Sequence, residues 1–302
     1  MNKLIDFLKQ QNIEFEENVD GKRLCSFHVG GSVSVVARPK KAEQLAQLYT
    51  YLNENNVKNI LLGKGSNLAI SDNGFDGVVV SLSELSRLDF DISDENCIVA
   101  GAGVPMLKLA SFAYQNGLTG LEFAQGIPGS VGGGVYMNAG AYGGEISDAL
   151  KSCLVFNTAT GELFIAYPKQ CDFSYRHSAF MDNKDLIILF ATFALKKGNA
   201  DEIKAKMDEF RAKRSASQPI EYPSAGSTFK RPEGHFAGKL IEDAGLKGYT
   251  VGGAQVSEKH AGFVINRGGA TCEDIKKLVE HIQKTVKEKF DVSLECEIEF
   301  IE

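Results

Sequence analysis

The sequence predicts an α+β fold in which helices and strands form three successive blocks. Within the first 82 residues, one helix is expected between predicted strands, which makes a strand–helix–strand unit. A second block consists mostly of strands and ends at a polar stretch, residues 196–200. A third block closes with a long helix and an alternating apolar–polar segment. Together the three blocks predict mixed helix and strand content.

The first block is predicted from apolar runs and from helical spacing. Residues 33–38, 59–62 and 78–82 are short apolar runs typical of strands. Leu45, Leu48 and Leu52 recur at helical spacing, so a helix is expected over residues 41–55. Residues 1–8 begin an amphipathic helix and are no signal peptide, because Asp6 interrupts the apolar run.

The second and third blocks follow from the same signals. Strands are expected at 97–101, 154–156, 163–166 and 186–195, with a helix from Pro105 to about residue 116. Beyond residue 200, helices are expected at 201–215, 238–244 and 271–290, and strands at 262–266 and 292–301. Thr271 stands where a helix N-cap is expected, with acidic residues in the first turn after it.

Composition excludes several classes of protein. The chain has 302 residues, is 43% hydrophobic and 24% charged, and has a net charge of −6, which argues against a nucleic-acid surface. No apolar run is long enough to span a bilayer, so we expect a cytoplasmic protein. Six cysteines form no C-x-x-C pair and five histidines form no metal motif, so we expect reduced thiols and no metal.

Residues 126–144 are the most glycine-rich part of the chain. Eight of these 19 residues are glycine, but apolar residues such as Val131 and Val135 interrupt them, which indicates a packed segment and not a linker. Glycine lets backbone N–H groups approach a ligand, and successive N–H groups form anion-binding concavities. The alternative is a plain glycine-rich turn under a sheet. The cradle is favoured because a second loop of the same character exists.

This other glycine-rich loop, residues 61–68, follows the apolar run at 59–62. Gly63 and Gly65 suit a tight turn with exposed N–H groups, and Ser66 and Asn67 add hydrogen-bonding side chains. No G-x-x-x-x-G-K-[ST] motif occurs, and Leu68 stands where a dinucleotide fingerprint needs glycine. A phosphate-binding role is therefore predicted without either common phosphate motif.

Three polar segments are candidates for chemistry. In residues 172–177, Arg176 either pairs with Asp172 at the surface or forks onto a carboxylate, which a planar guanidinium does better than lysine. In residues 223–232, Ser227 follows a glycine without any hydrolase motif, so it is either a turn serine or a proton donor. In residues 294–300, Glu297 is one of three glutamates expected on one strand face.

These segments occur in one order that resembles the UDP-N-acetylenolpyruvoylglucosamine reductase family. The resemblance spans essentially the whole chain. It is carried by LGKGSNL at 62–68, GIPGSVGG at 126–133, MNAGAY at 137–142, YR at 175–176, AGSTFK at 225–230, AGFVIN at 261–266 and LECE at 294–297.

The resemblance implies an α+β fold made of a two-part FAD-binding domain of the vanillyl-alcohol-oxidase type and a C-terminal α+β substrate-binding domain. The implied division is 1–86 and 87–200 for the two FAD-binding parts and 201–302 for the substrate-binding domain. It further implies an NADPH-dependent flavoenzyme that reduces the enolpyruvyl ether of UDP-N-acetylglucosamine to UDP-N-acetylmuramate. This reaction supplies peptidoglycan synthesis, and with it cell wall biogenesis, cell shape and cell division.

The resemblance also implies site residues. Ser227 is the implied proton donor, and Arg176 and Glu297 are the implied groups on the substrate carboxylate. Because an ionised carboxylate would repel the developing charge, Glu297 is expected either to be protonated or to act by hydrogen-bonding the enol form. The short 196–200 connection indicates the form without an inserted tyrosine loop. The implied FAD-binding residues are Gly63, Lys64, Gly65, Ser66, Asn67, Gly129, Ser130, Gly132, Gly133, Asn138 and Ala139, and the implied substrate-binding residues are Tyr175, Arg214, Lys230 and Arg231.

Two other functions stay open at this point. A different flavin oxidoreductase of the same fold, such as an alcohol oxidase, would share the glycine loops but would not need Ser227, Arg176 and Glu297 together. A nucleotide-sugar-binding module would need no flavin. The sequence leaves the oligomeric state undetermined.

Overall fold

The computed structural model describes residues 1–302 and divides them into two compact units. The first unit comprises Met1–Glu16, Val36–Lys64 and Gly77–Lys213, and the second comprises Glu17–Val35, Gly65–Asp76 and Arg214–Glu302. The chain therefore passes between the units several times, and the loop at 63–67 is itself divided at Lys64.

The helices and strands agree in type with most of the predicted elements. The helices are α1 Asn2–Gln10, α2 Ala42–Glu54, α3 Met106–Gln115, α4 Val131–Tyr136, α5 Pro168–Cys171, α6 Ala179–Asp182, α7 Ala200–Ser217, α8 Ala237–Asp243 and α9 Cys272–Phe290. The strands are β1 Glu14–Asp20, β2 Ser32–Arg38, β3 Asn59–Leu62, β4 Leu68–Ile70, β5 Phe75–Ser81, β6 Leu88–Asp91, β7 Asp94–Gly101, β8 Leu118–Thr119, β9 Gly140–Ala141, β10 Gly144–Glu145, β11 Leu150–Asn157, β12 Leu163–Ala166, β13 Leu186–Ala194, β14 Lys196–Lys197, β15 Thr250–Val251, β16 Ala254–Val256, β17 Val264–Asn266 and β18 Glu299–Ile301.

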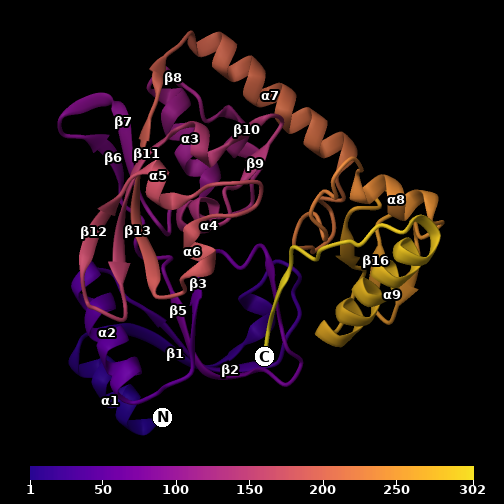
Figure 1. Cartoon of the computed structure of the whole chain (residues 1–302). Helices are drawn as coiled ribbons and strands as arrows, with labels where there is room; N and C mark the ends of the chain where they lie inside the picture. Colours follow the sequence, from indigo (N-terminus) through magenta and orange to yellow (C-terminus); the bar gives the residue numbers. More distant parts are fainter. The chain divides into compact units, whose positions relative to one another are not determined.

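The first unit is built on an antiparallel sheet in the order β12-β11-β13-β7-β6. Helix α4 packs against β13 and β7, and α3 lies beside it (Figure 1). Buried apolar residues such as Ile98, Leu109 and Phe193 form one core between the sheet and these helices. The glycine-rich segment is therefore packed against a sheet, as its apolar residues predicted.

A four-stranded sheet has the order β1-β2-β5-β3. Strands β3 and β5 are parallel, with Asn59 opposite Val78 and Leu62 opposite Ser81. The border between the two units passes through β1, β2 and β5. Because β3 ends at Leu62, the loop that begins with Gly63 lies at the carboxyl end of a parallel strand pair.

The second unit packs α8 and α9 with the small antiparallel sheet β15-β16-β17. Helix α9 begins as expected, because the side chain of Thr271 accepts a hydrogen bond from the N–H of Asp274, and Asp274 accepts one from the N–H of Thr271. The C-terminal strand β18 pairs in parallel with β4, with Glu299 opposite Leu68.

One expectation is wrong in detail, and one helix was not expected. The predicted strand over 292–301 is regular only at Glu299–Ile301, while Phe229 and Cys296 form an isolated bridge before it. Within the glycine run, Val131–Tyr136 forms a helical turn that the high glycine content hid. The division at 86/87 and 200/201 stays a prediction; helix α7 crosses the second of these positions and lies in the first unit up to Lys213.

Candidate active site

In chain order, residues 63–67 form the first glycine loop and residues 129–133 form the second. The first glycine loop follows β3 and has a tightly packed glycine at its centre. Gly65 has φ +64°, and a Cβ there would lie 1.9 Å from the carbonyl oxygen of Leu24. Its own carbonyl accepts a hydrogen bond of 2.9 Å from the N–H of Ser26. A non-glycine residue would be strained in this conformation as well as in collision. Lys64, one position earlier, is exposed.

The second glycine loop leads into α4. Ser130 is the N-cap, with its hydroxyl 3.5 Å from the N–H of Gly133. The backbone N–H groups of Val131 and Gly132 donate to the carbonyls of Val104 and Ala102, which attach the loop to the segment after β7. A Cβ on Gly63 would lie 2.6 Å from the Ser130 hydroxyl oxygen. The first unit therefore brings the start of one predicted FAD loop against the other.

Gly133 differs from its neighbours in the same loop. A Cβ on Gly132 would lie 2.8 Å from the Cβ of Ala102, whereas a Cβ on Gly133 would meet nothing closer than the Ser130 hydroxyl at 3.6 Å. Gly133 has no positive φ. Nothing in the packing of the chain therefore requires a glycine at position 133.

Arg176 lies in a tight turn over 174–177. Ser174 and His177 exchange two backbone hydrogen bonds of 3.2 Å, and Arg176 has φ +55°. The guanidinium donates a 2.9 Å hydrogen bond to the Gly140 carbonyl and lies 5.0 Å from the ring centroid of Tyr175, which is half-exposed. The turn sets the side chain toward the segment that follows α4.

Asn138 holds this turn from the same segment. Its side chain is fully buried, its Nδ2 donates to the Ser174 carbonyl at 3.1 Å, and its Oδ1 accepts from the Ser147 N–H at 3.0 Å. Ala139 beside it is also buried. The sequence predicted Asn138 as a cofactor contact; its amide is engaged with backbone at both ends.

Ser227 and Glu297 lie close together in the second unit. Residues 228–230 run beside 295–297, because the N–H of Glu297 donates to the Thr228 carbonyl at 2.9 Å and the N–H of Lys230 donates to the Glu295 carbonyl at 2.9 Å. Thr228 is buried and Ser227 before it is exposed. Ser227, the predicted proton donor, therefore immediately precedes Thr228, whose carbonyl accepts the hydrogen bond from Glu297.

Asn67 connects the first glycine loop to the same place. Its Nδ2 donates to the Glu297 carbonyl at 2.8 Å, and its own carbonyl accepts from the N–H of Glu299 at 3.0 Å. Glu297 is thus fixed through its backbone on both sides, and its side chain is half-buried. Sequence reasoning selected Asn67, Ser227 and Glu297 separately and had no signal that they are neighbours.

The predicted substrate-binding residues are distributed over both units. Lys230 forms an ion pair of 2.6 Å with Glu295, one of the three glutamates expected on one strand face. Arg231 is exposed, with its guanidinium 4.7 Å from the ring centroid of Phe236. Arg214 is half-buried near the end of α7. Tyr175 and Arg176 belong to the first unit, and the other five basic or catalytic positions belong to the second: Arg214, Ser227, Lys230, Arg231 and Glu297.

Cys296, between Glu295 and Glu297, is no candidate nucleophile. Burial, with a further contribution from the charges of these two glutamates, raises the pKa of its thiol. A thiol with a raised pKa stays protonated near neutral pH and is therefore a poor nucleophile.

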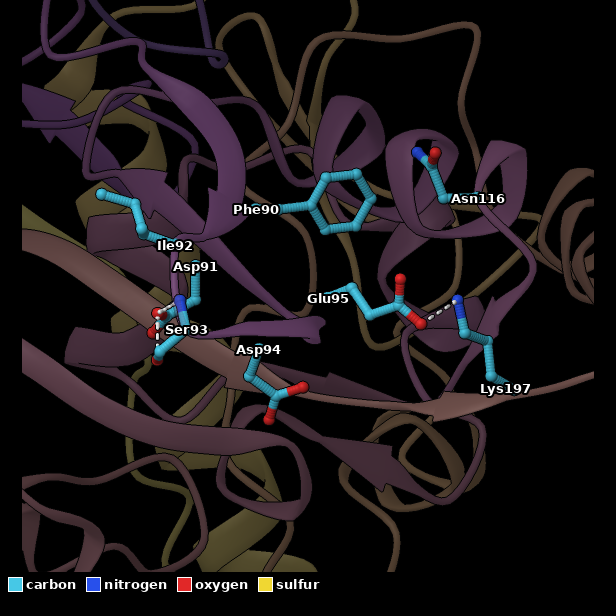
Figure 2. A pocket seen from close by; sticks show the side chains of 8 residues that line it. All are labelled: Phe90, Asp91, Ile92, Ser93, Asp94, Glu95, Asn116 and Lys197. Atoms are coloured by element: carbon cyan, nitrogen blue, oxygen red, sulfur yellow. Dashed lines mark hydrogen bonds and ion pairs between the residues drawn. The ribbon is translucent and has the colours of Figure 1, made fainter.

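A surface pocket of about 430 Å³ in the first unit contains none of the predicted site residues (Figure 2). Its acidic groups already have partners: Asp91 accepts from Ser93 at 2.7 Å, and Glu95 pairs with Lys197 at 3.4 Å. No group of three or more His, Cys, Asp or Glu side chains in the structure could hold a metal ion. No helix is both long enough and apolar enough to cross a membrane.

Comparisons with known proteins identify two domains and a family. Residues 33–166 match the model of an FAD binding domain, and residues 218–301 match that of the UDP-N-acetylenolpyruvoylglucosamine reductase C-terminal domain. The chain is 46% identical to the UDP-N-acetylenolpyruvoylglucosamine reductase of Caldanaerobacter subterraneus over 301 residues, which is 100% of this chain and 97% of that protein. The Listeria innocua reductase is 49% identical over 272 residues, 90% of each chain.

The chain belongs to the UDP-N-acetylenolpyruvoylglucosamine reductase family. Its structure is similar to the crystal structure of the Thermus caldophilus enzyme, with a TM-score of 0.80, 33% identity and coverage of 96% of this chain and 99% of that one. A plant protein, Physcomitrella patens BBE-like 1, has a TM-score of 0.50 at 16% identity over 64% of this chain and 44% of its own, and shares the fold alone.

Family membership confirms the predicted fold class, an FAD-binding domain of the vanillyl-alcohol-oxidase type followed by a C-terminal domain of this reductase family. The protein is an FAD-containing oxidoreductase. The assignment of individual site residues stays a prediction.

Proposed function

We propose that this protein uses NADPH to reduce the enolpyruvyl ether of UDP-N-acetylglucosamine to UDP-N-acetylmuramate, a precursor of peptidoglycan. The observation that carries the proposal is the pairing of residues 228–230 with 295–297, because it places Ser227 beside the Glu297 segment in the second unit. Reduction of an enol ether that carries a carboxylate needs both a proton donor and a group on the carboxylate, and the segment pairing brings a candidate for each role close together.

The two glycine loops fit FAD. Gly133 leaves open space where a Cβ would stand, although no contact within the protein demands glycine there. An open glycine in a helix lowers stability, so its presence favours close approach of a ligand to the backbone. Residues 63–67 would hold the pyrophosphate of FAD through backbone N–H groups. Residues 129–133 would approach it at Ser130 and Gly133, because the N–H groups of Val131 and Gly132 are already bonded within the protein. Bound flavin supplies the redox chemistry, taking hydride from NADPH and delivering it to the terminal carbon of the substrate.

Ser227 completes the reduction by protonation. Hydride addition at the terminal carbon leaves electron density on the adjacent carbon, which also bears the carboxylate. The hydroxyl of Ser227 gives its proton to that carbon and recovers one from water, since the residue is exposed. The double bond becomes a CH–CH₃ group, which is the lactyl ether of the product.

Arg176 and Glu297 act on the carboxylate into which that charge spreads. A guanidinium stabilises it through two parallel charge-assisted hydrogen bonds. Glu297 in its protonated form donates a hydrogen bond to the same group. Lys230, Arg231 and Arg214 are the basic groups that we assign to the diphosphate and sugar, because the net charge of −6 gives no general attraction for an anion.

The test separates the two halves of the reaction. Wild-type protein should be yellow, its flavin should be bleached anaerobically by NADPH, and the enolpyruvyl substrate should restore the colour. Ser227→Ala should bleach at a near-normal rate, whereas reoxidation by the substrate should slow by ~10²–10⁴-fold. Ser293→Ala, an exposed serine of the same unit, is the matched control and should behave as wild type.

Colourless protein, or bleached wild-type protein that the substrate fails to reoxidise, would refute the proposed reaction. A Ser227→Ala variant impaired in bleaching instead would show that the serine has another role. The cytoplasmic location expected from the sequence stays a prediction beside this proposal.

A further inference from the structure

We infer that Asn138 is a positioning residue for Arg176: its side-chain amide fixes the 174–177 turn that presents the guanidinium to the substrate carboxylate. The inference rests on the proposed function, because it gives Asn138 an effect on the reaction only through a group that this reaction uses. It differs from the role that the sequence predicted for Asn138, a contact with the cofactor.

The contacts of Asn138 are directed at this turn. Its side chain is fully buried, and Nδ2 donates to the carbonyl of Ser174, the first residue of the turn, at 3.1 Å. Oδ1 accepts from the N–H of Ser147 at 3.0 Å, which orients the amide. Because each end of the amide has a different backbone partner, the orientation of the side chain is fixed.

The turn itself needs such support. Arg176 has φ +55°, a conformation that a long side chain adopts only where its surroundings enforce it. The two hydrogen bonds between Ser174 and His177 are 3.2 Å long. The guanidinium is held at its far end by the Gly140 carbonyl at 2.9 Å. Asn138 therefore fixes the backbone of the turn that carries Arg176, and the Gly140 carbonyl fixes the guanidinium.

Loss of the amide releases the first of these two attachments. The turn would then relax away from the strained φ, and the guanidinium would shift relative to the substrate. A displacement of about 1 Å in a group that contacts the reacting molecule lowers the rate by roughly 10²-fold. Flavin binding should be preserved, because the hydrogen bonds of the Asn138 amide go to the protein backbone and the inference gives it no contact with the flavin.

The test uses the holoenzyme with Asn138→Gly, which removes the amide and tolerates the φ of +45° at this position. Flavin occupancy and the rate of bleaching by NADPH should stay within about twofold of wild type. Reoxidation by the enolpyruvyl substrate should slow by roughly 10- to 10²-fold. Asn138→Asp is the second variant: it keeps the shape and the acceptor for Ser147, and it replaces the donor to Ser174 by a buried carboxylate oxygen that repels the Ser174 carbonyl, so it should show at least the same loss.

Two further readouts distinguish positioning from a general structural role. In an Arg176→Ala background, Asn138→Gly should slow reoxidation no further, because the group through which it acts is gone. In titrations followed by the flavin spectrum of the oxidised enzyme, Asn138→Gly should bind the enolpyruvyl substrate more weakly. It should bind UDP-N-acetylglucosamine, which lacks the carboxylate, as wild type does.

The matched control is Asn157→Ala. Asn157 also holds a turn of the first unit, since its Oδ1 accepts from the N–H groups of Ala159 and Thr160, but this turn carries no predicted site residue. It should leave reoxidation unchanged. Loss of flavin in both Asn138 variants, equal losses in the two half-reactions, or full additivity with Arg176→Ala would each overturn the inference. Failure of the wild-type protein to be reoxidised would refute the proposed function instead.

Discussion

The two glycine loops look alike in the sequence and differ in what requires their glycines. At Gly65, in the second unit, the chain itself requires glycine, because a Cβ would lie 1.9 Å from the Leu24 carbonyl and φ is +64°. At Gly133, in the first unit, a Cβ would find open space beyond the Ser130 hydroxyl at 3.6 Å. The packing of the protein explains the glycine at position 65 and does not explain the glycine at position 133, for which we propose contact with the cofactor.

This difference separates two meanings of a glycine-rich loop. A structural glycine stabilises the native state, so its replacement lowers stability with or without a ligand. A glycine kept for a ligand lowers the stability of the free protein, so its replacement raises stability while it weakens binding. Substitutions in the two loops should therefore change the stability of the flavin-free protein in opposite directions.

The largest effect is expected for Gly65→Ala. Strain at a positive φ contributes ~1–3 kcal/mol, and the collision with the Leu24 carbonyl adds ~1–3 kcal/mol, both lowering the free energy of unfolding. Urea unfolding of the flavin-free protein followed by circular dichroism measures the sum.

The control for Gly65→Ala is Gly245→Ala in the same unit. Gly245 has φ +79° but no atom within 4 Å of an added Cβ, so this variant should show the strain without the collision. Equal losses in the two variants would mean that the Leu24 carbonyl moves aside easily, and the contrast between Gly65 and Gly133 would weaken.

A smaller effect, and a coupled one, is expected for Gly63→Ala. The added Cβ would lie 2.6 Å from the hydroxyl oxygen of Ser130 and 3.8 Å from the Cβ of Ser130. The single variant should lose about 1–3 kcal/mol of unfolding free energy. Ser130→Ala alone should lose at the low end of ~0.5–2 kcal/mol, because its N-cap bond to Gly133 is long at 3.5 Å.

The double variant Gly63→Ala/Ser130→Ala tests whether the two loops meet. Removing the hydroxyl makes room for the methyl group, so the double variant should be more stable than the sum of the single losses predicts. Strictly additive losses in urea unfolding would contradict the contact.

Most of the fold could be predicted from the sequence because its signals are local. The periodicity of α2, α7 and α9 and the apolar runs of β3, β11 and β13 depend on neighbouring residues alone. The strand expected over 292–301 failed because its alternation was read as one ladder. The chain instead bridges Phe229 at Cys296 and pairs with β4 only from Glu299. Helix α4 was missed because its first four residues, Val131 and three glycines, are poor helix formers. The helix is stabilised by packing against β7 and β13.

The candidate site could be predicted as a set of residue types and not as an arrangement. Ser227 and Glu297 are 70 positions apart in the sequence, and the pairing of their segments is a tertiary event. The contact of Asn67 with the Glu297 carbonyl likewise depends on the β4–β18 pairing. One local signal was available for Asn138: asparagine is among the residues that tolerate positive φ, which it adopts here at +45°.

Gly133→Ala should have the opposite sign from Gly65→Ala. In the flavin-free protein the alanine should raise the free energy of unfolding by about 0.5–1 kcal/mol, because position 133 is helical and has room for a methyl group. Affinity for FAD, measured by reconstitution of the flavin-free protein, should fall at least about tenfold, which corresponds to ~1.4 kcal/mol.

Gly134→Ala is the control in the same helix. Gly134 is buried, and its added Cβ would meet the sulfur of Met106 at 3.0 Å, so the change is felt by the core and not by a ligand. It should leave FAD affinity unchanged. Unaltered FAD affinity in Gly133→Ala would mean that the open space at this glycine is not where the cofactor approaches.

The smallest effect is expected for Lys64→Gln, at the exposed tip of the first loop. If FAD is held mainly by backbone N–H groups, the ammonium adds only a solvent-exposed attraction of about 0.2–1 kcal/mol, which high salt screens. FAD affinity should then fall less than about fivefold at low ionic strength and match wild type at high salt, with unfolding free energy unchanged. Lys9→Gln, an exposed lysine at the end of α1, is the matched control and should change neither quantity. If Lys64→Gln loses as much FAD affinity as Gly133→Ala, the charge of the Lys64 side chain contributes as much to binding as the glycine does. That result would contradict the proposal that FAD is held mainly by backbone N–H groups.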